Sequence, residues 1–252
     1  MASSAECEGV QRISAWFAGA GYGRHRHDTY AIGVTESGVQ SFWYRGTTHS
    51  SLPGEVVVLH PDETHDGYAG TDAGFGYRLL YIEPQRIAQA CGALPFVASP
   101  VIRNDRVART VRGAFDDDLA PDASEALIHE VAEALLHQAG AAPKRMRIDQ
   151  AAVERARQLL EAALPGSVRS SELEAVSGLS RFDLARQFRA RLGTSPYRYS
   201  LMRRLDRARA RLSRRPIADV ALEAGFADQA HFTRAFRAAH GVSPGRYARL
   251  RR

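Results

Sequence analysis

The sequence predicts an α+β protein in two parts, an antiparallel β-barrel with a helical hairpin followed by an all-α domain. Three observations predict this fold class. Short β-prone runs with frequent turns fill residues 10–83, apolar residues recur at helical spacing from Pro84 onward, and one helical pattern occurs twice after residue 170. At 252 residues, the chain has room for two ordinary domains.

The first part carries the signals of strands. Ser41–Tyr44 (SFWY) and Glu55–Leu59 (EVVVL) are β-prone runs, and glycine-rich stretches at Gly19–Gly23 and Gly67–Gly76 are predicted turns. Several short strands separated by turns are typical of a small antiparallel barrel.

Helical periodicity begins after the strands. Apolar residues recur four apart at Val107 and Val111 and again at Leu127, Val131 and Leu135, which predicts a helical hairpin within 103–138. The hairpin covers the open side of the barrel, meets a second subunit, or does both. Because the segment that follows it combines Ala, Gly, Pro and basic residues without an apolar period, we expect a linker there. The predicted domains are therefore 1–138 and 149–252, joined by a linker at 139–148.

The second domain is built on a repeat with a shift of 48 residues. LARQFRARLGTSPYRY, starting at Leu184, and FTRAFRAAHGVSPGRY, starting at Phe232, are identical at nine of sixteen positions, which include Arg186/Arg234 and Phe188/Phe236. Self-similarity of this kind is stronger evidence of architecture than a single short motif.

Each copy has the features of a helix with defined ends. Ser180 and Asp228, also 48 apart, are predicted N-caps, and Gly193 and Gly241 stand where a helix ends in a left-handed residue. A short helix ending in glycine precedes each copy. A helix, a tight turn and a second helix make a helix-turn-helix unit, so the sequence predicts two of them.

A connecting helix is predicted between the two units, over Pro196–Ser213. Its expected buried stripe consists of Tyr197, Leu201, Leu205, Ala208 and Leu212. A helix of that length spans about 27 Å. It would place the two second helices about one DNA turn, roughly 34 Å, apart.

Charge divides the chain in the same way. Residues 1–140 hold 10 Lys and Arg against 18 Asp and Glu, whereas residues 141–252 hold 24 against 10. A concentrated positive domain binds nucleic acid by neutralising phosphates. Double-stranded DNA is therefore the expected partner of the helical half.

Residues 150–252 resemble the DNA-binding domain of the AraC/XylS family of bacterial transcription regulators, and IADVALEAGFADQAHFTRAFRAAHGVSPGRY carries the closest match. The resemblance and the outward helix faces imply a set of DNA-contacting residues on both units. These residues are Arg181, Phe182, Ala185, Arg186, Arg189, Gln229, Ala230, His231, Thr233, Arg234 and Arg237. Ala185 is shorter than the polar residue that many relatives have there, so the first unit is expected to read fewer bases.

The N-terminal part resembles the cupin barrel that such regulators often carry. Gly19, His25 and His27 fit the first cupin motif, but the glutamate expected three or four residues later is replaced by Ala31 and Ile32. The barrel is therefore expected to bind a small effector rather than a catalytic metal, and no cofactor is expected. The candidate effector-binding residues are His25, His27, Tyr30, Trp43 and His65.

The remaining expectations follow from composition and from the resemblance. The start of the chain lacks a secretory signal, no apolar run is long enough to span a membrane, and Cys7 and Cys91 are too few for a disulfide framework. A bacterial cytoplasmic, nucleoid-associated protein is expected. The resemblance adds RNA polymerase as a partner and a homodimer formed through the helices of 103–138. Activation is the working expectation, but the sequence does not decide between activation and repression.

Two other classes of function stay open at this point. A metal-dependent cupin enzyme fused to a DNA-binding domain would hold stoichiometric metal on His25, His27 and His65. A ligand-independent DNA-binding regulator would show no effector-dependent change in binding. A ligand-responsive transcription regulator that is not an enzyme remains the favoured hypothesis.

Overall fold

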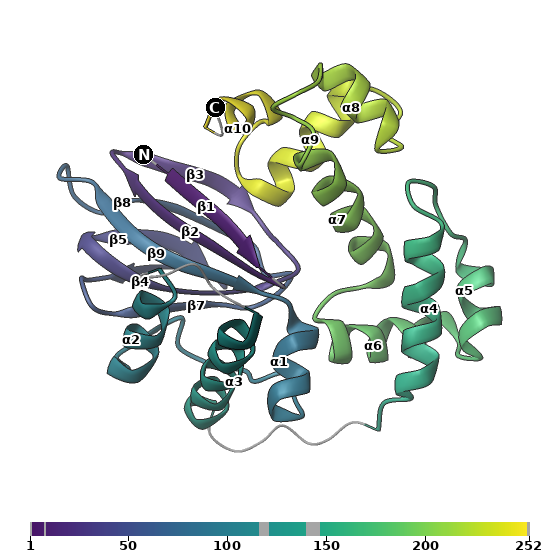
Figure 1. Cartoon of the computed structure of the whole chain (residues 1–252), viewed down its shortest axis with the longest axis horizontal. Coiled ribbons are helices and arrows are strands. Elements are labelled where there is room, and N and C mark those ends of the chain that lie inside the picture. Colours follow the sequence, from purple (N-terminus) through teal and green to yellow (C-terminus); the bar gives the residue numbers. More distant parts are fainter. Residues whose placement is uncertain (1, 8, 116–120, 140–146, 251–252) are drawn as a thin grey trace. The chain divides into compact units, whose positions relative to one another are not determined.

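The structure is a computed structural model that describes residues 2–7, 9–115, 121–139 and 147–250 (Figure 1). The chain divides into two compact units. Strands β1–β10 and helices α1–α3 form the first, called the sheet domain, except that His25–Asp28 are grouped with the second. Helices α4–α10 form the second unit, called the helical domain.

The strands of the sheet domain form two antiparallel sheets. One has the order β1-β2-β9-β4-β7-β10 and the other the order β3-β8-β5-β6. The six-stranded sheet consists of β1 (Ala2–Cys7), β2 (Val10–Phe17), β9 (Phe75–Ile82), β4 (Tyr30–Gly38), β7 (Val56–Leu59) and β10 (Val101–Ile102). The four-stranded sheet consists of β3 (Ala20–His25), β8 (His65–Ala69), β5 (Gln40–Tyr44) and β6 (Thr47–Ser51).

The expected antiparallel β domain is confirmed, but its strands form two sheets rather than one continuous barrel. In the described part of the chain, β1 and β10 are the edges of one sheet, and β3 and β6 are the edges of the other. The two sheets therefore face each other as separate layers. The glycine-rich stretches also differ from prediction, because β3 begins at Ala20 and β8 runs to Ala69, which leaves shorter turns.

Alternation along the strands creates two apolar cores. Ala31 in β4 and Val57 in β7 lie between the two sheets, whereas their neighbours Ile32 and Val58 lie on the opposite face of the six-stranded sheet. This is the period of two that a strand imposes on its side chains. Three helices cover that opposite face: α1 (Pro84–Cys91), α2 (Asp105–Gly113) and α3 (Pro121–Gln138) (Figure 1).

The helices of 103–138 cover a sheet face rather than the open side of a barrel. Leu127, Val131 and Leu135, the apolar stripe of α3, are buried in the same core as Ile32 and Leu80. The apolar stripe is therefore used within the subunit. A homodimer through these helices would have to use their exposed faces instead.

Seven helices make up the described helical domain. They are α4 (Gln150–Ala162), α5 (Ser170–Ser177), α6 (Arg181–Leu192), α7 (Pro196–Arg209), α8 (Ile217–Glu223), α9 (Gln229–His240) and α10 (Pro244–Leu250). Asp149 caps α4 by accepting a hydrogen bond from the Ala152 amide at 2.9 Å. The predicted linker at 139–148 mostly falls on residues 140–146, which lie outside the described residues.

Helix α7 is shared by two small cores. Tyr199 packs with Leu184 and Phe188 in the first core, and Leu205 packs with Phe232 in the second. Because one helix contributes to both cores, it holds the two helix-turn-helix units in a fixed relation.

Two details of the predicted connecting helix are wrong. Helix α7 ends at Arg209 rather than Ser213, which reduces its length to about 21 Å. Tyr197 was expected in the buried stripe but is 77% exposed, because the buried face contains Arg198, Tyr199 and Met202.

Among the described residues, no helix combines the length and the apolar character needed to cross a bilayer.

Candidate functional site

Helix α6 is the second helix of the first helix-turn-helix unit. The Ser180 hydroxyl accepts a hydrogen bond from the Asp183 amide at 3.2 Å, so Ser180 is the N-cap. Gly193 ends the helix with φ 73°, a left-handed conformation that favours glycine. Leu184 and Phe188 bury one face of the helix, so its opposite face is left outward. The predicted ends and buried stripe of α6 are confirmed.

Helix α9 repeats this construction in the second unit. Asp228 accepts a hydrogen bond from the His231 amide at 2.6 Å, and Gly241 ends the helix with φ 69°. Phe232 and Phe236 are fully buried. The two helices therefore expose equivalent faces, as the 48-residue repeat predicts.

The predicted DNA-contacting residues all lie on these outward faces. Ala185 and Thr233 are half-buried, Phe182 is 72% exposed, and the others of the set are exposed as well. The exposed residues besides Phe182 are Arg181, Arg186, Arg189, Gln229, Ala230, His231, Arg234 and Arg237. The His231 ring also meets Phe226 edge-on, with ring centroids 5.2 Å apart. The geometry thus leaves the whole set accessible to a partner.

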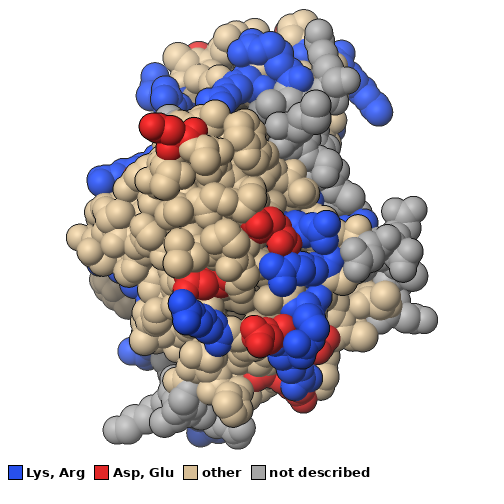
Figure 2. Space-filling view, turned by 90° about the vertical axis from the view of Figure 1, so that its left-hand side faces the viewer, with Lys and Arg blue, Asp and Glu red and all other residues tan. Residues whose placement is uncertain are grey.

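Charge distinguishes the two faces. The Arg186 guanidinium is paired with Asp183 at 2.6 Å, whereas Arg234 has no acidic partner in the described part of the chain. Figure 2 shows one area of the surface where Lys and Arg atoms gather with few acidic atoms beside them, and another where acidic and basic atoms are mixed.

Two arginines that the sequence analysis did not single out as positioning residues hold the first helices of the two units. In the first unit, Arg155 of α4 donates to the carbonyl oxygens of Val176 and Ser177 at 2.8 and 2.9 Å. In the second, Arg204 of α7 donates to the carbonyl oxygens of Ala224, at 2.8 Å, and Gly225. Both satisfy carbonyls at a helix C-terminus, where a cation is favourable. They fix the turn that sets each outward helix.

The candidate effector residues of the sheet domain do not all come together. His25 ends β3, and His65 begins β8, which is the neighbouring strand in the sheet. Tyr30 lies instead in the core under the helices, where its hydroxyl donates to the Pro95 carbonyl at 2.8 Å. Trp43 is half-buried, with the Arg24 guanidinium 4.2 Å from the centre of its ring. Strand alternation places Tyr30 and Trp43 away from the histidines.

His25, His27 and His65 are each buried, and imidazole is a common ligand of catalytic zinc. The carboxylate of the cupin pattern is missing there. Ala31, at its expected position, is fully buried in the apolar core, and the nearby Glu63 is bound by Arg45 at 2.5 Å. That the protein binds no essential metal stays a prediction.

A buried network around His60 also went unrecognised in the sequence. The Val97 amide donates to His60 Nε2 at 3.0 Å, and His60 Nδ1 lies 3.0 Å from both the Tyr44 hydroxyl and a guanidinium nitrogen of Arg45. Burial, helped by the nearby positive Arg45, lowers the pKa of His60 to about 4. The network ties the loop after α1 to the sheets through a histidine that stays neutral at pH 7.

Comparisons with known proteins agree with this architecture. The model of the AraC-like ligand binding domain matches residues 9–180, and that of a helix-turn-helix domain matches residues 173–250. The chain is 24% identical over 220 residues to the uncharacterized HTH-type transcriptional regulator YbfI of Bacillus subtilis (strain 168), which covers 82% of this chain and 80% of that protein.

Solved structures show the same fold over nearly the whole chain. ToxT from Vibrio cholerae superposes with a TM-score of 0.69 at 11% identity, covering 96% of this chain and 99% of ToxT. A structure of unsaturated fatty acid bound ToxT gives a TM-score of 0.68 at 12% identity, covering 95% and 94%.

A ligand-binding domain followed by two helix-turn-helix units defines a DNA-binding transcription regulator with an effector-binding N-terminal domain. The AraC-like domain model covers more than half of the sequence. The chain belongs to the AraC family.

Proposed function

We propose that this regulator reads DNA by placing α6 and α9 in successive major grooves. The observation that carries the proposal is the repetition of one capped helix, with Arg186 and Arg234 exposed at equivalent positions. A lone arginine on a solvated helix face has no special meaning. Two in register on equivalent helices, joined through one shared helix, match what two-groove recognition requires.

Within that proposal, the residues have different roles. Arg186 and Arg234 read base edges, because a guanidinium fits two acceptors of guanine. Arg181, Arg189 and Arg237 are phosphate contacts that position the protein. Gln229, His231 and Thr233 add polar groups to the second unit, whereas the first unit has Phe182 and Ala185 on the corresponding face. The second unit therefore contributes more to sequence preference.

The sheet domain is the effector-binding part in this proposal, and His25, His27 and His65 are its candidate polar contacts. The protein acts as a regulator and not as an enzyme. The alternative of a metal-dependent enzyme would use these three histidines as metal ligands instead. Elemental analysis of the purified protein distinguishes the two.

Further partners belong to the same proposal. We infer contact with RNA polymerase and activation of transcription, in the cytoplasm and on the nucleoid, because DNA is the proposed binding partner of the helical domain. The proposed domain boundaries are 1–138 and 149–252, with a linker between them. A homodimer through 103–138 would use the exposed face of α3, which carries His129 and Glu133.

The test is DNA binding by the full chain. Double-stranded fragments selected from a random library should converge on one sequence with two recognition segments. Binding to that sequence should weaken steeply as salt rises, because phosphate contacts release counterions. Failure of the library to converge, with equal affinity for every fragment, contradicts sequence-specific reading.

A further inference from the structure

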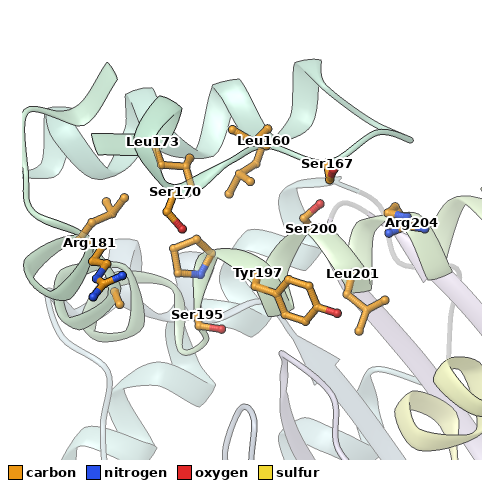
Figure 3. A pocket seen from close by; sticks show the side chains of 14 residues that line it. Leu160, Ser167, Ser170, Leu173, Arg181, Ser195, Tyr197, Ser200, Leu201 and Arg204 are labelled. Atoms are coloured by element: carbon orange, nitrogen blue, oxygen red, sulfur yellow. The ribbon is translucent and has the colours of Figure 1, made fainter. Parts of the chain in front are cut away.

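The helical domain contains a pocket of about 300 Å³ beside the first helix-turn-helix unit (Figure 3). Its floor includes the buried side chains of Leu160, Leu173 and Leu184, from α4, α5 and α6. Figure 3 shows Tyr197 and Leu201 of α7 opposite Leu160 and Leu173. This volume lies at the small end of the range for ligand pockets, roughly 300–1,000 Å³. The pocket therefore suits a small molecule with an apolar body.

Positive charge lies at the two ends of this pocket. Arg181 and Arg204 both line it, and Figure 3 shows them at opposite ends. In the described part of the chain, neither guanidinium is paired with a carboxylate. Arg204 donates to neutral carbonyls, so its charge stays uncompensated, and burial lowers the pKa of its guanidinium.

Three helix N-termini add to the positive electrostatic potential in the pocket. Helices α5, α6 and α7 begin at Ser170, Arg181 and Pro196, and all three residues line the pocket. A helix N-terminus carries partial positive charge, which favours an anion. Three carboxylates oppose it: Glu172 and Asp183 lie in the first turns of α5 and α6, and Glu174 accepts a hydrogen bond from the Arg181 amide at 2.7 Å. Glu172 and Asp183 are paired with Arg169 and Arg186, which leaves Glu174 as the acid that opposes the charges of Arg181 and Arg204.

We propose that this pocket binds an apolar monocarboxylate, with its carboxylate on Arg181 and its body over Leu160 and Leu173, and that its occupation weakens DNA binding. Arg181 is the carboxylate partner because, among the described residues, its guanidinium donates no hydrogen bond and only lies over the Phe182 ring at 4.7 Å, whereas that of Arg204 is fixed on Ala224 and Gly225. The regulatory half of this statement rests on the proposed function, because Arg181 and Ala185 both line the pocket and belong to the proposed DNA-contacting set. Binding free energies of two ligands that share a residue are coupled reciprocally.

The first experiment is calorimetric titration of the full chain, without DNA, with decanoate and with decanol as the uncharged control of equal chain length. Decanoate should bind at least about tenfold more tightly than decanol, because a charged hydrogen bond supplies the difference. Arg181→Gln should remove this preference and leave decanol binding unchanged. The matched control is Arg189→Gln, which removes an exposed arginine of the same helix that does not line the pocket.

Ser200→Phe assigns the site, because Ser200 lines the pocket on α7 and a phenyl ring would fill the space. It should abolish decanoate binding while circular dichroism shows an unchanged fold, whereas Ser213→Phe, outside the pocket, should leave binding intact. Equal affinity for decanoate and decanol, or retained binding in both Arg181→Gln and Ser200→Phe, contradicts the proposal. If Ser200→Phe does not fold, the result with Arg181→Gln alone decides.

The second experiment measures DNA affinity by fluorescence anisotropy with and without saturating decanoate. The wild-type chain should lose about tenfold in affinity for its selected DNA, and Ser200→Phe should lose none. Unchanged DNA affinity of the decanoate-saturated protein overturns the regulatory half. If the chain binds no DNA at all, the proposed function fails, while the calorimetric result still stands on its own.

Discussion

Replacing Arg234 with Ala should weaken binding to the selected DNA by about 1–3 kcal/mol, the range of one good bidentate contact with a base. Arg234 is exposed and has no acidic partner among the described residues, so no ion pair there has to break before Arg234 contacts a base. On random DNA the loss should be much smaller, because a base-reading residue contributes little where its base is absent.

The equivalent change at Arg186 should cost less. Arg186 must first leave Asp183, to which it is paired at 2.6 Å. The two side chains are 66% and 45% exposed, so the pair contributes only about 0.2–1 kcal/mol. Breaking this pair offsets part of the free energy that the Arg186–base contact contributes. The loss of DNA affinity in Arg186→Ala should therefore be smaller than in Arg234→Ala. By the same reasoning, Asp183→Asn should tighten DNA binding by up to about 1 kcal/mol.

The assay is fluorescence anisotropy with the full chain on selected and scrambled duplexes at one fixed salt concentration. Arg106→Ala serves as the matched control, because it removes one exposed arginine from the sheet domain. Equal losses on both duplexes would make Arg186 and Arg234 phosphate contacts. A larger loss for Arg186→Ala than for Arg234→Ala would refute the reasoning from the ion pair.

Three more predictions address the sheet domain. The folded-state pKa of His60 is lowered to about 4 from 6.5, so the unfolded chain takes up a proton at a higher pH than the folded chain does. The free energy of unfolding should therefore fall by about 2 kcal/mol between pH 7 and pH 5. In urea unfolding, the free energy of unfolding of His60→Gln should depend less on pH than that of the wild type, and an identical pH dependence would contradict the assignment. Val131→Glu should destabilise the domain by at least about 3 kcal/mol because it buries an unpaired charge, whereas the exposed His129→Glu should be nearly neutral; a folded Val131→Glu variant would place that face outside the core. Elemental analysis should find no stoichiometric transition metal, and one metal per chain that is lost in His27→Ala would overturn that expectation.

Much of the helical domain was predictable because the same helix-capping residues occur in both copies of its repeat. The caps Ser180 and Asp228 and the terminal glycines Gly193 and Gly241 act within one turn of their own helix. The end of α7 was not predictable in the same way. Apolar Leu212 continues the helical period, but it reaches the second core from a turn beyond the helix end.

The sheet domain shows what sequence periodicity leaves open. Alternation in β4 and β7 predicts two faces, but it does not say whether the strands close into a barrel or divide into two sheets. The apolar stripe of α3 likewise fits a subunit core or a dimer interface equally well, and the structure shows that the core uses it. His60 gave no signal because its partners, Tyr44 and the Val97 amide, are distant in sequence.

Hydroxyl-radical footprinting of the full chain on the DNA upstream of its own coding sequence tests the central claim most directly. One chain with two recognition helices should protect two segments on the same face of the duplex, about one helical turn or 10 base pairs apart. In Arg234→Ala the protection of one segment should weaken while the other remains. Protection of a single segment, or of both equally weakened by that one change, would contradict an independent reading role for the two helices.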